Sequence, residues 1–345
     1  MATLLTTNYP TLVDIARAQD PNGKIAVMAE ILNAYNEILD DLPFTEANMG
    51  SMHKTTLRAK IPAPTWRLLN YGVQPVKSTN NQIIDSCGML EAYSEIDKSL
   101  ADLNGNAPSY RLSEDKAIIE GIGQELASTI IYGDTSVNPE KFVGLAPRYY
   151  GYTSTNGGTT YGNVIDAGGR ASVNTSIWLV GWSPETIHGI FPKGSKGGLS
   201  VMDKGQVTLW DTQTPPGKYE GYQTHFKQDA GLCVRDWRFV VRIANIDVTA
   251  LATAGDGNDT SANLIKLMSL ALDKFPPVGN VRPVFYCNQL VRGLLRVKMA
   301  SKSNVWLDLN KDMMSASGFP RPTLTFMGYP VRRVDAILNT ETALT

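Results

Sequence analysis

The sequence predicts an α+β fold. Three segments, at 113–133, 262–274 and 288–300, have the apolar spacing of helices. Runs with a two-residue period stand between and around them, most clearly in RDWRFVVRIAN at 235–245. Helices and strands do not alternate regularly, so a mixed α+β class is favoured over a doubly wound parallel sheet.

Two helices are predicted near the start of the chain, at 11–19 and 21–39. The apolar residues from Ile25 to Leu39, Tyr35 among them, fall on one face of the second helix. Asp20 before Pro21 fits a helix cap. The first ten residues are expected to form a free arm.

A long hairpin is predicted after Met52. The strand pattern there alternates, with one basic face made of Lys54, Thr56, Arg58 and Lys60 and an opposite face made of Thr55, Leu57, Ala59 and Ile61. The segment PAPTWRLLNYG, which carries Trp66 and Arg67, forms the tip, and a second extended run follows through 82–84. A two-stranded hairpin is not stable alone, so it must lie on something else, most naturally a neighbouring subunit. Its basic face is either solvated or an electrostatic seam against an acidic partner.

The clearest helix is predicted from Ser113 to Gly133. Ser113 suits the N-cap, and the acidic pair Glu114 and Asp115 suits the positive first turn. The apolar stripe consists of Ile119, Ile122, Leu126 and Ile130. Gly133 suits the end of the helix.

The stretch YGDTSVNPEKFVGLAPRY at 132–149 combines Gly and Pro with charged side chains, as the rim of an active site does. We interpret it as a turn-rich connector from helix to sheet. Asp134, Glu140, Lys141 and Arg148 are expected to fix the loop geometry or to meet a neighbouring subunit rather than to transfer protons.

The remaining segments are mostly predicted strands. TSTNGGTTYGNVIDAGG at 153–169 is expected to be a flexible surface loop and PETIHGIF at 184–191 to begin a short helix. The predicted strands are IWLVGW, GLSVMD, QVTLWD, YQTHFK, RDWRFVVRIAN, VRPVFYC and the two halves of LTFMGYPVRRVDAIL around a turn at 328–330. In RDWRFVVRIAN, apolar Trp237, Phe239, Val241 and Ile243 alternate with Arg238, Val240 and Arg242.

Composition limits the classes of function. A net charge of −1 and a charged fraction of 19% argue against tight binding to nucleic acid, so any contact with DNA should be loose. The N-terminal stretch lacks the pattern of an export signal, and no apolar run is long enough to span a membrane. Cys87, Cys233 and Cys287 are odd in number and widely spaced, which favours buried thiols over disulfides or a zinc site.

The templates for catalysis do not fit. KGSKGGLS lacks the order of a phosphate-binding loop, GIGQEL lacks the third glycine of a dinucleotide fingerprint, and GWSPE is not a nucleophile elbow. DGND at 256–259 is out of phase for a calcium loop, and His53, His188 and His225 show no metal-ligand spacing. Most tryptophans fit core packing, with Trp66 the exception. We therefore assign no catalytic residue, cofactor or metal. A carboxylate-based hydrolase acting on glycans stays open, because its acids can lie far apart in sequence.

The order of segments is distinctive: an arm, a long hairpin, one long helix, a mixed domain and a closing MGYPVRRVDAIL. This order resembles the major capsid proteins of tailed bacteriophages, which have the Hong Kong 97 fold. YGDTSVNPEKFVGLAPRY, IWLVGWSPETIHGIFPKGSKGGL and HFKQDAGLCVRDWRFVVRIANID are similar to the branch found in short-tailed phages of the epsilon15 type. The resemblance covers nearly the whole chain.

The resemblance implies a domain plan and a set of partners. The N-terminal arm would be 1–45, the extended loop 46–107, the peripheral domain with its spine helix 108–171, and the axial domain 172–309. Part of 231–250 would return to the peripheral sheet, and 310–345 would complete it. Subunits would form pentamers and hexamers in an icosahedral shell around double-stranded DNA, assembled in the host cytoplasm with decoration, scaffold and portal proteins and no membrane.

The candidates for contact between subunits are Lys54, Arg58, Lys60, Trp66, Arg67, Asp134, Glu140 and Arg148. Some relatives cross-link a Lys of the extended loop to an Asn of a neighbour, but no motif here fixes such a partner for Lys54 or Lys60. A virion decoration or tail protein is a further alternative, although it would give no reason for the long helix.

Overall fold

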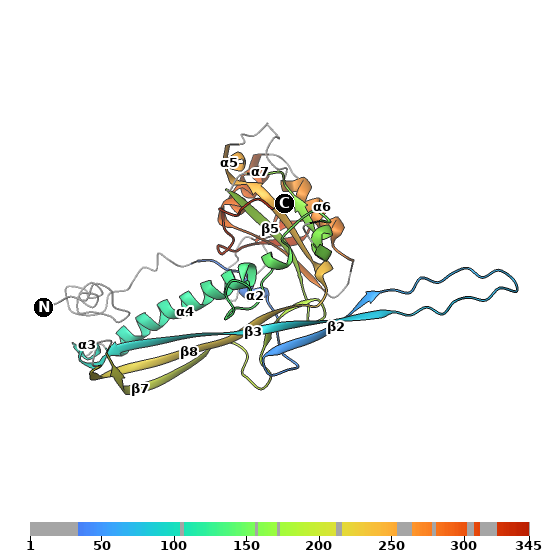
Figure 1. The fold of residues 1–345 in the computed structure, drawn as a ribbon. Coiled ribbons are helices and arrows are strands. Elements are labelled where there is room, and N and C mark those ends of the chain that lie inside the picture. Colours follow the sequence, from blue (N-terminus) through green and yellow to red (C-terminus); the bar gives the residue numbers. More distant parts are fainter. Residues whose placement is uncertain are drawn as a thin grey trace. The chain divides into compact units, whose positions relative to one another are not determined.

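The computed structural model describes residues 34–103, 107–155, 158–170, 173–211, 216–253, 264–277, 281–301, 307–310 and 323–344 (Figure 1). The predicted helix at 11–19, most of the one at 21–39, and the segments around 256–259 and Trp306 lie outside these residues. The chain divides into two compact units. One contains 89–126 and 198–229, and the other contains 35–88, 127–197 and 230–345. Three elements contribute residues to both units: strand β3 (Thr79–Asp97), strand β8 (Lys218–Val234) and helix α4 (Ala107–Tyr132).

The larger unit is built on a mixed sheet whose centre is β5 (Asn174–Trp182), flanked by antiparallel β9 (Val240–Asp247) and β10 (Arg282–Cys287). The order continues through β13 (Tyr329–Arg333) and β12 (Thr323–Phe326) to β11 (Leu307–Asn310), while β4 (Val164–Asp166) pairs with β9. Every residue of β5 is buried, as the apolar run IWLVGW predicted.

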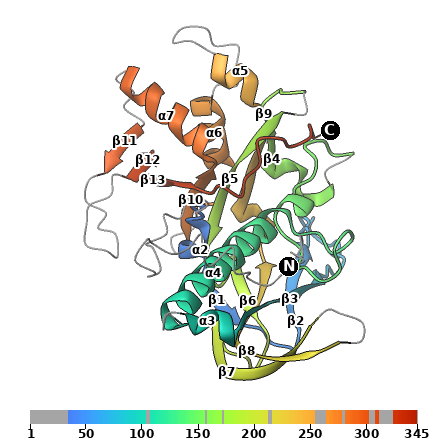
Figure 2. The same ribbon diagram turned by 90° about the vertical axis from the view of Figure 1, so that its left-hand side faces the viewer.

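Two helices complete the core of this unit. α6 (Leu264–Lys274) and α7 (Gln289–Ser301) lie beside the sheet in Figure 2, and their apolar faces share one core with β5, β9 and β10. Both were predicted from their helical spacing. The short helix α5 (Val248–Thr253) follows β9, and Leu251 joins the same core.

The turn between β12 and β13 shows how local sequence specifies a hairpin. Met327 and Gly328 adopt positive φ angles of 50° and 84°, as two-residue turns between antiparallel strands require. The predicted turn at 328–330 therefore falls slightly too late, because Tyr329 and Pro330 already belong to β13.

Three predictions in this unit are wrong. PETIHGIF forms strand β6 (Ile187–Phe191) and not a helix, because β6 pairs on one side with β8 and on the other with β1 (Phe44–Glu46). The expected flexible loop at 153–169 contains the short helix η3 (Gly158–Asn163) and β4, whose Val164 is buried. RDWRFVVRIAN begins with the short helix η4 (Trp237–Phe239), and its strand β9 is buried on both faces.

The start of the described chain also departs from the prediction. Asn36 forms a bridge with Val334, and the helix α2 covers only Ile38–Asp41. Tyr35 is 52% exposed and lies beneath the guanidinium of Arg333. Within the described part of the expected helix at 21–39, residues 34–36 are therefore not helical, because Asn36 pairs with the C-terminal segment, and only 38–39 belong to a helix.

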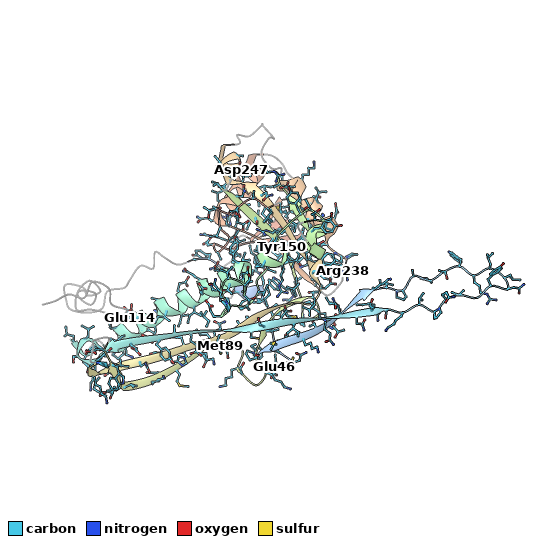
Figure 3. All side chains as sticks on the ribbon, in the orientation of Figure 1. Glu46, Met89, Glu114, Tyr150, Arg238 and Asp247 are labelled. Atoms are coloured by element: carbon cyan, nitrogen blue, oxygen red, sulfur yellow. The ribbon has the colours of Figure 1, made fainter. Side chains whose placement is uncertain are left out.

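The predicted hairpin is present. β2 (Met52–Lys60) pairs antiparallel with β3 (Thr79–Asp97), and the residues between them form a loop without strand pairing. In Figure 3 the side chains of this loop stand free along its length beyond the paired strands. Thr55 is buried while Lys54, Thr56 and Arg58 are exposed, so the predicted alternation holds along the first part of β2.

The smaller unit combines the first part of α4 (Ala107–Tyr132) with β7 (Ser200–Trp210), β8 (Lys218–Val234) and the last part of β3. A small core forms around Ile96, Tyr110 and Ala101, the last in helix α3 (Lys98–Ala101). Arg111 pairs with Asp203 at 2.5 Å. GLSVMD and QVTLWD prove to be one strand with an irregularity at Gly205.

Helix α4 begins earlier than predicted. Ser113 lies inside it rather than at its N-cap, and Glu114 and Asp115 are not in its first turn. Ile122, Leu126 and Ile130 are buried as expected, but Ile119 is 41% exposed. The helix ends at Tyr132, next to the predicted terminator Gly133. Among the described residues, no helix has the length and apolar content needed to cross a membrane.

Candidate functional site

The connector after α4 is held by its own side chains. The Asp134 carboxylate accepts hydrogen bonds from the Ser136 backbone N–H at 2.8 Å and from its hydroxyl at 2.6 Å, and these bonds lower the pKa of Asp134. Glu140 is exposed. The connector then forms the short helix η2 (Ala146–Arg148) before entering the sheet. Asp134 thus fixes the loop geometry, one of the two roles predicted for it.

Arg148 is directed inward. Its guanidinium donates to Asp85 Oδ1 at 2.7 Å and to the backbone oxygens of Val143, Gly144 and Leu232 at 3.2–3.3 Å. Asp85 is 3% exposed. Arg148 therefore joins the connector to β3 and β8 within one subunit, and its contact with a neighbouring subunit stays a prediction.

The hairpin presents the other predicted contact residues to solvent. The side chains of Lys54, Arg58 and Lys60 are exposed on β2, and none forms an ion pair with a described residue. Trp66 at the tip is 103% exposed, and Arg67 beside it is exposed too. These five residues therefore all lie on the exposed hairpin.

The tip is strongly apolar for an exposed segment. Leu68 and Leu69 are 73% and 87% exposed, and Ile61 and Tyr71 are 80% and 70% exposed. Exposed apolar patches of this kind mark sites of protein association.

Trp210 on β7 is a second exposed tryptophan, with 55% of its surface exposed, so the prediction that it packs in the core is wrong. Trp178 and Trp182 are buried, as predicted.

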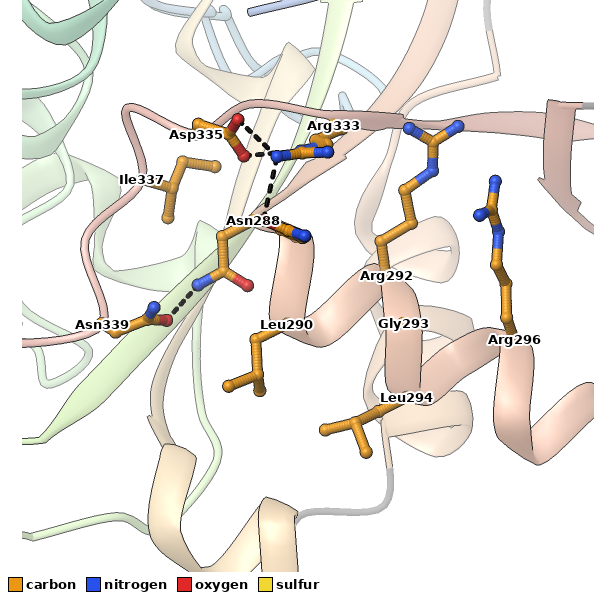
Figure 4. A pocket seen from close by; sticks show the side chains of 11 residues that line it. Asn288, Leu290, Arg292, Gly293, Leu294, Arg296, Arg333, Asp335, Ile337 and Asn339 are labelled. Carbon is orange, nitrogen blue, oxygen red and sulfur yellow. Dashed lines mark hydrogen bonds and ion pairs between the residues drawn. The ribbon is translucent and has the colours of Figure 1, made fainter. Parts of the chain in front are cut away.

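A cavity of about 870 Å³ lies between the start of α7 and the segment after β13 (Figure 4). Arg333 and Asp335 form a bidentate pair there, with both N···O distances at 2.7 Å, and Arg292 pairs with Glu37 at 3.3 Å. The lining residues include no Ser, Cys, His or Tyr, and their single carboxylate, Asp335, is held by Arg333, so no acid–base pair is available for catalysis there. We therefore assign no catalytic role to this cavity.

A buried charged network joins strand β9 of the larger unit to the C-terminal segment. Arg242 on β9 pairs with Glu341 at 2.9 Å, donates to the Tyr149 backbone oxygen at 2.9 Å, and lies over the Trp178 ring. Glu341 also accepts hydrogen bonds from Tyr132 and Ser176. Burial raises the pKa of Tyr132 well above its usual value, and the nearby Glu341 adds to this effect. The network fixes the C-terminal segment and offers no open site for a substrate.

The structure brings together two histidines and one cysteine whose spacing in the sequence did not indicate a shared site. One donor atom from each of His53, His188 and Cys233 lies within 4.8 Å of the others. Burial, together with His53 and Arg235, lowers the pKa of His188 to about 4, and burial beside Asp85 raises the pKa of the Cys233 thiol to about 12. His225 lies apart from this cluster, paired with Glu91 at 3.3 Å and stacked on Tyr93.

This cluster was missed because its members are distant in sequence. Strand register would have shown it: His53 lies opposite Asp85 on β2 and β3, and His188 lies opposite Cys233 on β6 and β8. Cys87, Cys233 and Cys287 are not joined in disulfides, and Cys233 and Cys287 are buried as predicted, whereas Cys87 is only partly buried.

Comparison with known proteins identifies the family. The family model of the major capsid protein GP7 matches residues 20–345. The chain belongs to this family of major capsid proteins. The comparison with curated protein sequences gave no match.

A solved structure of bacteriophage epsilon15 is similar over the full length of both chains, with 34% identity and a TM-score of 0.77. This similarity confirms the capsid-type α+β fold and the epsilon15-type resemblance. An encapsulin from Synechococcus elongatus PCC 7942 aligns with 12% identity over 70% of this chain and 96% of that one, with a TM-score of 0.44. The capsid of Myoviridae phage XM1 aligns with 10% identity over 64% and 94%, with a TM-score of 0.41.

The protein is thus the major capsid protein of a tailed phage, a component of the virion that associates with itself in a shell. The family is structural, and the glycan hydrolase alternative is not favoured. The exposed hairpin and its tip are therefore considered as parts that build a shell.

Proposed function

We propose that this capsid protein forms pentamers and hexamers that close an icosahedral shell around double-stranded DNA, and that the hairpin tip docks on a neighbouring subunit. The exposed tip is the observation that carries this proposal. Trp66 and Leu69 stand in solvent on a loop that has no strand pairing of its own. Burying a large apolar side chain contributes about 1.5–3 kcal/mol, so the tip gains most when a second copy covers it.

The basic face of β2 supports the same contact. Lys54, Arg58 and Lys60 have no acidic partner among the described residues, so they are free to pair with acidic groups of a neighbour. Charges at such a contact set the register and the rate of association more than its strength. They complement the apolar tip, which supplies the affinity.

The domain plan follows the same proposal. The arm at 1–45, the extended loop at 46–107, the peripheral domain at 108–171, the axial domain at 172–309 and the return at 310–345 are proposed to be the functional parts. The net charge of −1 suits loose contact with packaged DNA. Assembly would take place in the host cytoplasm, with scaffold, decoration and portal proteins as further partners.

Replacing both Trp66 and Leu69 by Ser should abolish or strongly reduce shell formation while the subunit stays folded. Both side chains are exposed in the isolated chain, so their loss removes a contact between subunits and little internal packing. Sedimentation and electron microscopy of the purified full-length protein measure the shells, and near-ultraviolet circular dichroism measures folding.

A matched control is Leu112→Ser, which removes a side chain that is 58% exposed on α4. It should leave more shells than the double variant does. Normal shells from Trp66→Ser/Leu69→Ser would refute docking through the tip.

Arg58→Glu and Lys60→Glu should each impair assembly more than folding. Each change reverses a charge on the exposed face of β2, where no internal partner is lost. Lys196→Glu, the same change in the exposed loop before β7, is the control. Shell yield at low and high salt is the measurement, because added salt weakens a seam between exposed charges. Wild-type yields from both β2 variants would count against the seam.

A further inference from the structure

The His53, His188 and Cys233 cluster is built on two cross-strand pairs. His53 lies opposite Asp85, and His188 lies opposite Cys233. The four strands that carry them are neighbours in the order β6-β8-β3-β2. The two imidazole rings meet edge to face, with centroids 5.7 Å apart. The donors thus converge from four strands of the larger unit.

The cluster is buried, and some of its polar atoms are poorly satisfied. His188, Cys233 and Asp85 are 3%, 0% and 3% exposed. Nδ1 of His188 and Oδ2 of Asp85 are buried without a hydrogen bond of full geometry among the described residues, although the Cys233 thiol lies beside Asp85 and the Ser183 backbone lies beside His188. A buried polar atom that is poorly satisfied costs up to about 1–3 kcal/mol, so these two need an explanation. A bound cation would supply a partner to both.

We propose that His53, His188 and Cys233 bind Zn²⁺, with Asp85 as the fourth ligand. Zinc is the common metal that accepts imidazole, thiolate and carboxylate together, and it prefers four ligands in a tetrahedron. At zinc distances of about 2.0–2.3 Å, neighbouring ligand atoms lie about 3.3–3.7 Å apart. The donor atoms of His53, His188 and Cys233 lie within 4.8 Å of one another, whereas the Asp85 carboxylate is outside this group and has to turn toward it. Small side-chain rotations would therefore close the site.

The Cys233 thiol releases its proton to solvent as the Zn–S bond forms. The thiolate then offsets one charge of Zn²⁺, and the Asp85 carboxylate is shared between the metal and Arg148. Arg148 already holds the other Asp85 oxygen at 2.7 Å, as groups around a metal site commonly orient a ligand.

One existing contact has to change. The Asn48 backbone N–H donates to Nδ1 of His53 at a long 3.3 Å. Ligation through Nε2 moves the ring proton to Nδ1 and gives up this bond, which the metal bond outweighs. His53 is the second residue of β2. Zinc would consequently tie the root of the hairpin to β6 and β8, and it would stabilise the folded chain because it binds only where these strands meet.

Zinc titration of the purified full-length protein tests the proposal. After treatment with a chelator, the wild-type protein should take up one Zn²⁺ per chain in competition with a chromophoric chelator. His53→Gln should weaken this affinity at least about tenfold, because even groups outside the ligand set cost 10–100-fold when removed. His225→Gln is the matched control and should bind as the wild type does, since His225 belongs to another pair.

Cobalt tests the thiolate. Co²⁺ bound to the wild-type protein should show the charge-transfer absorption of a cobalt–thiolate bond, which Cys233→Ser should lose and Cys87→Ser should keep. If Cys233→Ser fails to fold, His53→Gln still decides the question, because His53 is only half-buried. No zinc uptake by the wild type, or equal affinity in His53→Gln, overturns the proposal.

Discussion

Replacing Glu341 by Leu should lower the free energy of unfolding by about 3–5 kcal/mol, the cost of leaving a buried charge without its partner. The side chains of Arg242 and Glu341 are only 4% and 7% exposed, and their N···O distance is 2.9 Å. The change also removes the acceptor for the hydrogen bonds from Tyr132 and Ser176. Arg242 and Ser176 would stay buried without this partner.

Denaturant unfolding of the unassembled subunit measures this effect. Arg238→Ala breaks the exposed ion pair with Asp236 and should change stability little. The double variant Arg242→Met/Glu341→Leu should recover much of the loss, because it removes both charges together. If Glu341→Leu were as stable as Arg238→Ala, the network would not hold the C-terminal segment in place.

Gly133→Ala should destabilise the subunit by about 3 kcal/mol or more, because the new methyl group has no room. A Cβ at this position would lie 2.4 Å from the Phe142 backbone oxygen and 2.5 Å from that of Thr129. Backbone atoms cannot rotate away as side chains can. The Gly144 N–H also donates to the Gly133 oxygen at 2.7 Å, so the connector folds back tightly on the end of α4.

Gly121→Ala makes the same change in the middle of α4, where nothing lies within 4 Å of the added methyl group. It should stabilise the helix by up to about 1 kcal/mol, because Ala favours the helix more than Gly does. The two thermal unfolding curves should therefore move in opposite directions. A shift in the same direction for both variants would contradict the close packing at Gly133.

The spacing of residues along the chain predicted those elements whose structure depends mainly on residues close in sequence. Gly133 ends α4 because the chain can fold back there only without a side chain. The alternation of residues along β2 is visible in the sequence because one face of that strand meets solvent. The start of α4 was misplaced at Ser113, because a serine before acidic residues looks the same at a cap and inside a helix.

Non-local pairing explains the errors. The alternating pattern put Arg242 on the face of the strand opposite Val241 and Ile243. In the structure β9 is buried on both faces, and the Arg242 charge meets Glu341, which is 99 residues away. The segment at 187–191 became a strand because β1 and β8 offered backbone partners on both sides. Neither fact can be obtained from a window of neighbouring residues.

The α+β class, the long hairpin and the long helix depend on residue order and short-range spacing, so they could be predicted from the sequence, and three stretches of the chain resembled capsid proteins. The inward direction of Arg148 and the cluster of His53, His188 and Cys233 appear only in the folded chain. Strand register explains this difference: which residues lie opposite one another depends on partners far along the chain, and a shift of one residue would turn each side chain to the other face.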